Sequence, residues 1–275
     1  MRYDTVYFNM VKSPGKARTT DPNPDIPEMD AGGEKIFIIS DAHLGADDGA
    51  AESVKREGLI RFFEHVRNNG DRLIILGDLF DFWFEYRYMI DFIHFPVLAG
   101  LWQTRRSGVR IDYYLGNHDY WTSGFLSSEL VTHVRKTPHC EVIGGKKALL
   151  AHGDGLTGDE KGYLLMRRIL RHPVTYYLFR LLHPDVGAWL ARRTSMVSRK
   201  GIERKRERSA SILRNFARKA LEAGEYDWII VGHSHQPELS SFGKGIYLNI
   251  GDWSEHFTYG MVKDGDVRLM KWEEC

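Results

Sequence analysis

Residues 75–84 read ILGDLFDFWF, an apolar run whose only polar side chains belong to Asp78 and Asp81. The run continues a predicted strand over residues 72–76, and Gly77 lets the backbone turn sharply where that strand ends. An unpaired carboxylate in apolar surroundings is costly or takes up a proton, so each aspartate needs a cation or a strong donor nearby. The stretch therefore predicts a buried strand that delivers carboxylates to a site completed by other segments.

Four further predicted strands end in the same way. Their apolar runs lead into Asp41 and His43, into Asn117, His118 and Asp119, into His152 and Asp154, and into His233 and His235. The carboxyl ends of strands form the edge where α/β sheets bind ligands. Five of the twelve histidines lie at these points, and we treat the other seven as structural or surface residues.

The side chains at these strand ends are typical of a metal site. Asp, His and Asn without Cys favour Mn, Fe or Zn over Ca. Residues two apart in an extended segment point to the same side, so Asp41 with His43, and His233 with His235, can each direct two ligands into one pocket. A single pair of this kind arises readily by chance. All the signals in order, each after an apolar strand, indicate a metal centre.

The order of apolar and helical patterns predicts an α/β fold with parallel strands. We expect strands over residues 36–40, 72–76, 109–115, 141–143, 147–151, 228–231, 245–250, 259–262 and 267–272, with helices over about 52–69 and after Pro96. Strand patterning is absent from about 156 to 224, which predicts a helical insertion broken at Pro173 and Pro184.

The N-terminal residues have a different composition. Residues 1–34 are rich in Pro, Asp and Gly, which predicts a loosely ordered tail ahead of one domain over 35–275. The first thirty residues lack the apolar core of a signal peptide, and no apolar run has the length of a spanning helix. Two cysteines, Cys140 and Cys275, are too few for a disulfide framework. We therefore expect a cytoplasmic protein.

Charge is unevenly distributed along the chain. The net charge is only +1, yet residues 156–220 hold 16 Lys and Arg against 5 Asp and Glu. A solvated helical face would explain this excess. Attraction to an anionic ligand or surface is the alternative that we favour for a segment so rich in Arg.

The blocks DAH, GD, GNHD, HGD and GHSH, in this order, resemble those of the calcineurin-like metallophosphoesterases. The resemblance implies a sandwich of two β-sheets flanked by helices, with a helical lid insertion. It also implies two divalent metal ions, for which we expect manganese, with iron or zinc as alternatives. One ion would be held by Asp41, His43, Asp78 and His235, and the second by Asp78, Asn117, His152 and His233.

The same resemblance assigns roles to the second aspartate and to the histidine of the GNHD block. It implies that Asp81 orients His118 and raises the pKa of its imidazole, so that His118 acts as the general acid. The alternative for Asp81 is a simple cap or turn residue. A pair of metal ions would offset the burial of Asp78 and activate water for attack on phosphorus.

The larger pattern of DAHLG, GDLFDFWFEY, GNHDYW, HGDGL, GHSHQPEL and LNIGDW resembles the UDP-2,3-diacylglucosamine hydrolases of lipid A synthesis. This implies cleavage of the substrate's pyrophosphate into UMP and 2,3-diacylglucosamine 1-phosphate, with the acyl chains under the lid. We expect Arg192, Arg193, Arg199 and Lys200 to bind the anionic substrate, and the lid to rest peripherally on the anionic inner membrane.

One departure keeps other substrates open. Many enzymes of that lipid family read G-N-R-D, whereas His118 follows Asn117 here, as in the wider superfamily. The chain could instead be a paralogue acting on another phosphodiester or monoester. A nuclease is a further alternative, because a basic lid with interleaved aromatic residues could bind nucleic acid. The apolar run over 176–182 suits acyl chains better, and no nucleic-acid module is recognisable.

Overall fold

The computed structural model describes residues 33–47, 49–122, 124–136, 138–157, 161–198 and 202–273. These residues belong to one compact unit, Gly32–Cys275. Nearly all of the predicted tail over 1–34 lies outside the described residues, so its loose order stays a prediction.

A six-stranded sheet has the order β11-β10-β1-β2-β3-β4. Its strands are β1 (Ile36–Ile39), β2 (Arg72–Ile75), β3 (Arg110–Tyr114), β4 (His133–Arg135), β10 (Thr258–Lys263) and β11 (Asp266–Lys271). Strands β1 to β4 are parallel, whereas β10 and β11 form an antiparallel hairpin beside β1. Since β1, β2 and β3 are parallel neighbours, their carboxyl ends lie at one edge.

A five-stranded sheet has the order β5-β6-β7-β9-β8. Its strands are β5 (His139–Ile143), β6 (Lys146–Ala151), β7 (Trp228–Val231), β8 (Glu238–Phe242) and β9 (Gly245–Asn249). The central strands β6, β7 and β9 are parallel, and the edge strands β5 and β8 are antiparallel to their neighbours. This sheet therefore also delivers the ends of its central strands to one edge.

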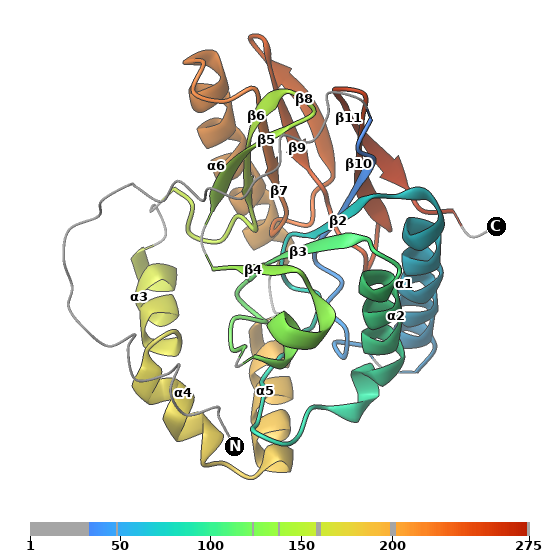
Figure 1. Ribbon diagram of the computed structural model, residues 1–275. Coiled ribbons are helices and arrows are strands. Elements are labelled where there is room, and N and C mark those ends of the chain that lie inside the picture. Colours follow the sequence, from blue (N-terminus) through green and yellow to red (C-terminus); the bar gives the residue numbers. More distant parts are fainter. Residues whose placement is uncertain are drawn as a thin grey trace, which may run out of the picture. The chain divides into compact units, whose positions relative to one another are not determined.

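Apolar residues form one layer between the sheets and one on each outer face. The inner layer includes Ile38, Ile74, Leu150 and Ile230. Helices α1 (Gly49–Asn69) and α2 (Phe95–Arg106) cover the six-stranded sheet, and the short helical segments η1 (Phe92–His94) and η2 (Leu126–Leu130) lie beside α2. Helix α6 (Ile202–Glu222) covers the five-stranded sheet (Figure 1). The predicted two-sheet sandwich flanked by helices is confirmed.

The segment predicted as a lid insertion contains α3 (Lys161–Leu170), α4 (Pro173–Arg180), α5 (Pro184–Ser198) and α6. Helices α4 and α5 begin at the two prolines that were expected to break the segment, because proline suits the first helical position. In α6, Leu213, Ala217 and Leu221 are buried against the five-stranded sheet. The C-terminal part of α6 therefore belongs to the core of the sandwich.

Two strands were not predicted, β4 and β8. Both lie at a sheet edge, where one side of the strand has no neighbour. Strand β4 is only three residues long, and β8 reads ELSSF with alternating half-buried and exposed residues. Neither forms the apolar run by which a buried strand is recognised.

A buried ion pair lies at the amino ends of β2 and β3. Arg72 Nε donates to Asp112 Oδ2 at 2.5 Å, and Arg72 Nη2 reaches Glu141 Oε1 at 2.7 Å. Burial alone would raise the pKa of Asp112, but Arg72 and Arg110 outweigh it and hold that pKa below its usual value. Since Glu141 belongs to β5, Arg72 joins the two sheets, and it does so at the edge opposite the carboxyl ends of β2 and β3.

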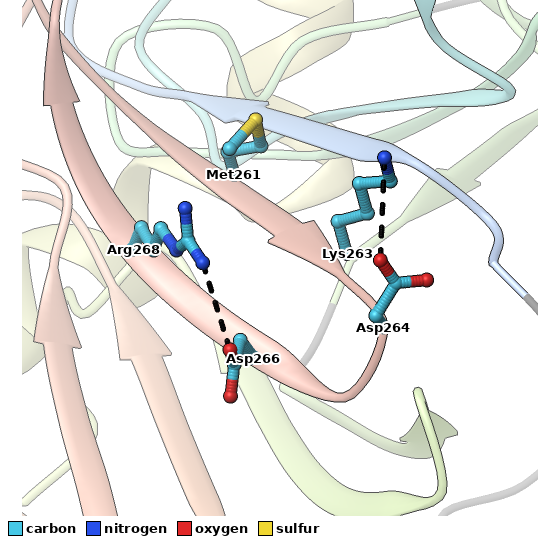
Figure 2. Close-up of a pocket in the computed structure, with 5 residues that line it drawn as sticks. All are labelled: Met261, Lys263, Asp264, Asp266 and Arg268. Atoms are coloured by element: carbon cyan, nitrogen blue, oxygen red, sulfur yellow. Dashed lines mark ion pairs between the residues drawn. The ribbon is translucent and has the colours of Figure 1, made fainter.

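A small pocket of about 70 Å³ lies on the β10–β11 hairpin (Figure 2). Its lining side chains form two ion pairs, Lys263 with Asp264 at 4.0 Å and Arg268 with Asp266 at 3.6 Å. Because Val262 pairs with Ile36, the hairpin turn lies at the amino end of β1. The pocket is therefore remote from the predicted site.

Candidate metal centre

The backbone holds the predicted ligands in an unusual conformation. Five of them have positive φ, namely Asp41 (53°), His43 (44°), Asp78 (52°), His233 (70°) and His235 (56°). Such residues cost on the order of 1–3 kcal/mol each and persist only where surrounding contacts fix them. Backbone bonds supply part of this restraint, because Asp41 N donates to Gly77 O at 3.1 Å and His43 N to Asp78 O at 3.0 Å.

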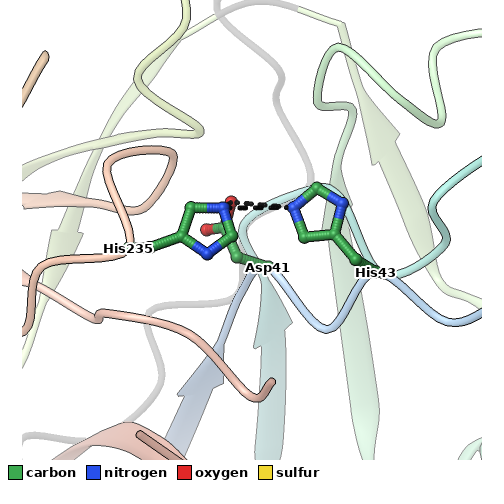
Figure 3. A group of neighbouring side chains, drawn as sticks. All are labelled: Asp41, His43 and His235. Atoms are coloured by element: carbon green, nitrogen blue, oxygen red, sulfur yellow. Dashed lines mark hydrogen bonds and ion pairs between the residues drawn. The ribbon is translucent and has the colours of Figure 1, made fainter. Parts of the chain in front are cut away.

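A first group of ligands comprises Asp41, His43 and His235 (Figure 3). The Nε2 atoms of the two histidines are 3.2 Å apart, and lie 3.7 Å (His43) and 3.4 Å (His235) from Asp41 Oδ1. That carboxylate oxygen is buried and accepts no hydrogen bond within the described part of the chain. Ligands about 2.1 Å from one metal ion are themselves separated by about 3 to 3.5 Å. The three side chains therefore fit a divalent cation.

A second group surrounds His152. Its Nε2 lies 3.3 Å from Asp78 Oδ2, 3.2 Å from Asn117 Oδ1 and 3.2 Å from His233 Nδ1. Asp78 Oδ2 is also 3.8 Å from His43 Nε2, so this oxygen lies between the two groups. The structure thus brings all seven predicted ligands together, with Asp78 in the position of a bridge.

The carboxylates of this cluster stabilise positive charge on neighbouring groups. Burial would lower the pKa of His43, but Asp41 and Asp81 outweigh it and raise that pKa to about 10. The pKa of His152 is likewise raised by Asp78 against the effect of burial. Burial and neighbouring His152 lower the pKa of His233 to about 4. Divalent cations would compete with the protons on His43 and His152 for the same nitrogens.

Lys55 is a buried residue of α1 beneath the first group. Its Nζ donates to the carbonyl oxygens of Ala42 (3.3 Å) and His43 (3.1 Å), and lies 3.0 Å from carboxylate oxygens of both Asp47 and Glu52. The ammonium group therefore fixes the turn on which His43 has positive φ. Lys55 was not predictable from the sequence, because a lysine within an amphipathic helix gives no sign that it is buried.

Asp119 plays a corresponding part beneath the second group. Its Oδ1 accepts from Gly116 N at 2.8 Å, and its Oδ2 accepts from Leu79 N at 2.9 Å and from the Tyr113 hydroxyl. Burial and the neighbouring Asp78 raise the pKa of Asp119 to about 6. Asp119 therefore ties the loop of Asp78 to the loop of Asn117. The GNHD block pointed to this residue without giving it a role.

Asp252 supports His235 from behind. Its Oδ2 lies 3.7 Å from His235 Nδ1 and 2.7 Å from His256 Nδ1. A histidine that binds metal through Nε2 carries its proton on Nδ1, and the negative charge of a nearby carboxylate favours that tautomer. Arg206 of α6 also lies close, with Nη2 3.2 Å from His235 Nδ1. The GDW motif at 251–253 was the available signal for Asp252.

His118 contacts Asp81 through the backbone of that residue more closely than through its carboxylate. His118 Nδ1 lies 2.7 Å from the backbone oxygen of Asp81, whereas the Asp81 carboxylate is 3.7 Å away. The same carboxylate is 3.6 Å from His43 Nδ1. Since the carbonyl can only accept, Nδ1 carries the proton and Nε2 remains for other partners. His118 is 28% exposed, which leaves its side chain accessible to a ligand.

The four basic residues predicted to bind substrate are placed only in part. Arg199 and Lys200 lie outside the described residues, as does the side chain of Arg192. Arg193 is exposed, with its guanidinium 5.5 Å from the ring centre of Trp189. Their substrate role stays a prediction.

Aromatic contacts seat the insertion on the loop that follows Asp81. Phe82 and Phe84 pack on Phe179 of α4 with ring centres 5.5 and 4.8 Å apart, and Phe84 stacks on Tyr176 at 5.2 Å. The ring centre of Trp121, three residues after His118, lies 5.0 Å from that of Phe179. The aromatic residues that follow Asp81 thus anchor α4 of the insertion.

Large apolar side chains nevertheless remain exposed around this seat. On α3 to α5 they are Leu165, Ile169, Leu170, Val174, Tyr177, Leu178, Leu181, Val186, Trp189 and Leu190. Near η1 they are Tyr88, Met89, Phe92 and Phe95. Clusters of exposed apolar residues mark binding surfaces for proteins, lipids or ligands. No helix among the described residues is long and apolar enough to cross a membrane.

Known proteins match most of the chain. A family model described as calcineurin-like phosphoesterase matches residues 34–237. A UDP-2,3-diacylglucosamine hydrolase of Porphyromonas gingivalis is 30% identical over 86% of this chain and 97% of its own length. One from Tolumonas auensis is 28% identical over 86% of this chain and 96% of its own length. A solved archaeal phosphodiesterase covers 86% of this chain and 98% of its own, at 14% identity and a TM-score of 0.43.

Proposed function

We propose that this chain, which belongs to the calcineurin-like phosphoesterase family, hydrolyses UDP-2,3-diacylglucosamine. The products would be UMP and 2,3-diacylglucosamine 1-phosphate. Metal-dependent phosphoester hydrolysis follows from the family. The acylated nucleotide-sugar is supported by relatives that match nearly their whole length. The observation that carries the proposal is the apolar insertion seated directly on the loop of Asp81.

We propose manganese as the metal, with iron or zinc as alternatives that suit the same donors. Asp41, His43 and His235 would hold one ion, and Asn117, His152 and His233 the other, with Asp78 between them. When bound, such a pair neutralises phosphate charge and makes hydroxide available near neutral pH.

The chain's own residues would supply the proton and the binding surface. His118, with Nδ1 donating to the carbonyl of Asp81, presents Nε2 as the atom that can protonate the leaving phosphate oxygen. The exposed apolar side chains of α4 and α5 would cover the acyl chains, because each buried CH₂ contributes about 0.8 kcal/mol. Basic residues of α5, among them Arg193, would rest on anionic lipids of the cytoplasmic membrane surface.

Mass spectrometry of products tests the proposal. The chain is incubated with manganese and UDP-diacylglucosamine, or with UDP-N-acetylglucosamine, which lacks the two long acyl chains. UMP and the acylated sugar phosphate should form from the first substrate much faster than the matching products from the second. Equal rates would refute the lipid specificity and favour another phosphodiester or monoester. Cleavage of DNA or RNA in preference to both would favour a nuclease.

A further inference from the structure

Arg167 of helix α3 and Arg171, in the turn after that helix, both reach the loop that follows His152. Arg167 Nη1 donates to Asp154 Oδ2 at 3.0 Å and to Asp154 O at 2.7 Å. Arg171 Nη2 donates to the same carboxylate oxygen at 3.0 Å. Asp154 is 7% exposed, so this pairing occurs in a largely desolvated position.

Arg171 continues from there toward the loop of Asn117. Its Nη2 also lies 3.4 Å from the carbonyl oxygen of Gly116, and its guanidinium sits 4.1 Å from the ring centre of Tyr120. Gly116 precedes Asn117, and a Cβ at Gly116 would collide with Asp78 Oδ1. The guanidinium is therefore fixed between the two loops that carry Asn117 and His152.

The positive charge of Arg167 and Arg171 exceeds the negative charge of Asp154, and some of the hydrogen-bond donors of Arg171 have no partner among the described residues. Arg167 and Arg171 together carry two positive charges against the single carboxylate of Asp154. Within the described part of the chain, Nε and Nη1 of Arg171 make no hydrogen bond, although the side chain is 19% exposed. A planar guanidinium with free donors is suited to the oxygens of a phosphate.

We propose that Arg171 is a substrate-binding residue whose guanidinium donates hydrogen bonds to an oxygen of the substrate's phosphate beside the second group of metal ligands. Tyr120 and Asp154 hold the guanidinium in place, so that binding an anion through its remaining donors would cost little further side-chain freedom. The proposal rests on the proposed phosphoesterase function, but not on the identity of the lipid. It gives the turn between α3 and α4 a polar role next to the apolar surface of α4 and α5.

The test uses the full, manganese-loaded chain and a soluble diester, bis(4-nitrophenyl) phosphate, with inorganic phosphate as a competing ligand. Arg171→Gln should raise both KM and the inhibition constant of phosphate roughly tenfold to a hundredfold, as expected for a lost charge-assisted hydrogen bond. Arg171→Lys should lie between, because an ammonium keeps the charge and loses the planar fork. The turnover number on this activated ester should change much less.

Arg168→Gln is the matched control, since it removes one exposed positive charge from α3, three residues before Arg171. Metal content and thermal unfolding are measured for every variant. If Arg171→Gln loses metal, the phosphate inhibition constant of Arg171→Lys at full metal occupancy tests the proposal instead. A phosphate inhibition constant equal to that of the control would then overturn the proposal, and a raised one would support it. A fall in turnover number with unchanged phosphate affinity would also overturn it. A wild-type chain that hydrolyses neither this diester nor UDP-2,3-diacylglucosamine would refute the hydrolase function itself.

Discussion

Asp78 lies near both groups, with Oδ2 3.3 Å from His152 Nε2 and 3.8 Å from His43 Nε2. Its replacement by alanine should weaken both metal sites at once, because each group loses the same carboxylate. We expect Asp78→Ala to bind almost no metal and to lose measurable hydrolysis of any phosphoester. Metal analysis and diesterase rates check this.

Asn117→Ala is the companion variant, since it removes one neutral ligand from one group. It should keep some metal and part of the activity. Near-normal activity in Asp78→Ala would contradict the bridging role.

His118 gives a prediction that depends on the leaving group. If its imidazole donates the proton, His118→Ala should slow a substrate with a poor leaving group by roughly 10² to 10⁴, and a nitrophenyl ester much less. Equal losses on both substrates would argue for a binding or structural role.

Asp81→Asn removes the carboxylate charge of Asp81 and keeps its backbone carbonyl, so it tests which of the two groups His118 depends on. The backbone oxygen, and not the carboxylate, lies at hydrogen-bond distance from His118 Nδ1. This variant should therefore keep most of the rate on the substrate with the poor leaving group. A loss as large as that of His118→Ala would show that the carboxylate is required.

Lys55 tests how the strained turn of His43 is held. Removing a buried ammonium that pairs with two carboxylates costs roughly 3–5 kcal/mol. Lys55→Met should lower the free energy of unfolding by about that amount and weaken metal binding in the first group. Chemical denaturation and metal titration measure both. Glu57→Gln, an exposed change two residues along α1, is the control and should alter neither.

The pairing of β2 with β3 across Arg72 and Asp112 should make stability depend on pH. The lowered pKa of Asp112 means that the folded chain binds its proton less readily than the unfolded chain does. Its stabilising contribution is therefore complete above the unfolded pKa of about 4, and is lost as pH falls through the lowered folded pKa.

Asp112→Asn should accordingly unfold at lower denaturant than the parent at pH 7, with a difference of roughly 3 kcal/mol that shrinks below pH 4. Urea titrations across this range measure it. A difference that stays constant with pH would contradict the assignment.

Helices and strands with a strong apolar pattern were predictable from the sequence, and weakly patterned ones were not. Strands β1, β2 and β7 are buried along their whole length, so continuous apolar runs marked them. Strand β8 became a strand through its pairing with β9, which local sequence does not encode. Prolines at 173 and 184 marked helix starts because their effect on the backbone is local.

The ligands of the candidate site were recognisable for a related reason, since each follows directly on an apolar strand. Their supporting residues were not. Lys55 lies 12 residues from His43, and Asp119 acts on Leu79, 40 residues away in the sequence. Contacts of this kind arise only when the strands are assembled, so neither spacing nor composition announces them.

The exposed apolar and basic residues of the insertion suggest attachment to a membrane surface. Each Arg or Lys near an anionic membrane contributes about 1 kcal/mol, so Arg192→Gln with Arg193→Gln should weaken binding to anionic vesicles by about 2 kcal/mol. Vesicle sedimentation measures this, and high salt should erase the difference. Neutral vesicles are the control. Equal binding of parent and variant to anionic vesicles at low salt would contradict the surface orientation.

The positive φ angles at five of the predicted ligands limit which residues can replace them. Apart from glycine, Asp, Asn and His are the residues that most readily adopt a left-handed backbone, and they are also residues whose side chains bind metal. Exchange among these three types could retune the metal preference of the centre while the main chain keeps its course. Glu or Cys would offer a ligand atom but would have to bear the backbone penalty. Over evolutionary or laboratory time, the repertoire of metals open to this scaffold is thus governed by its main chain.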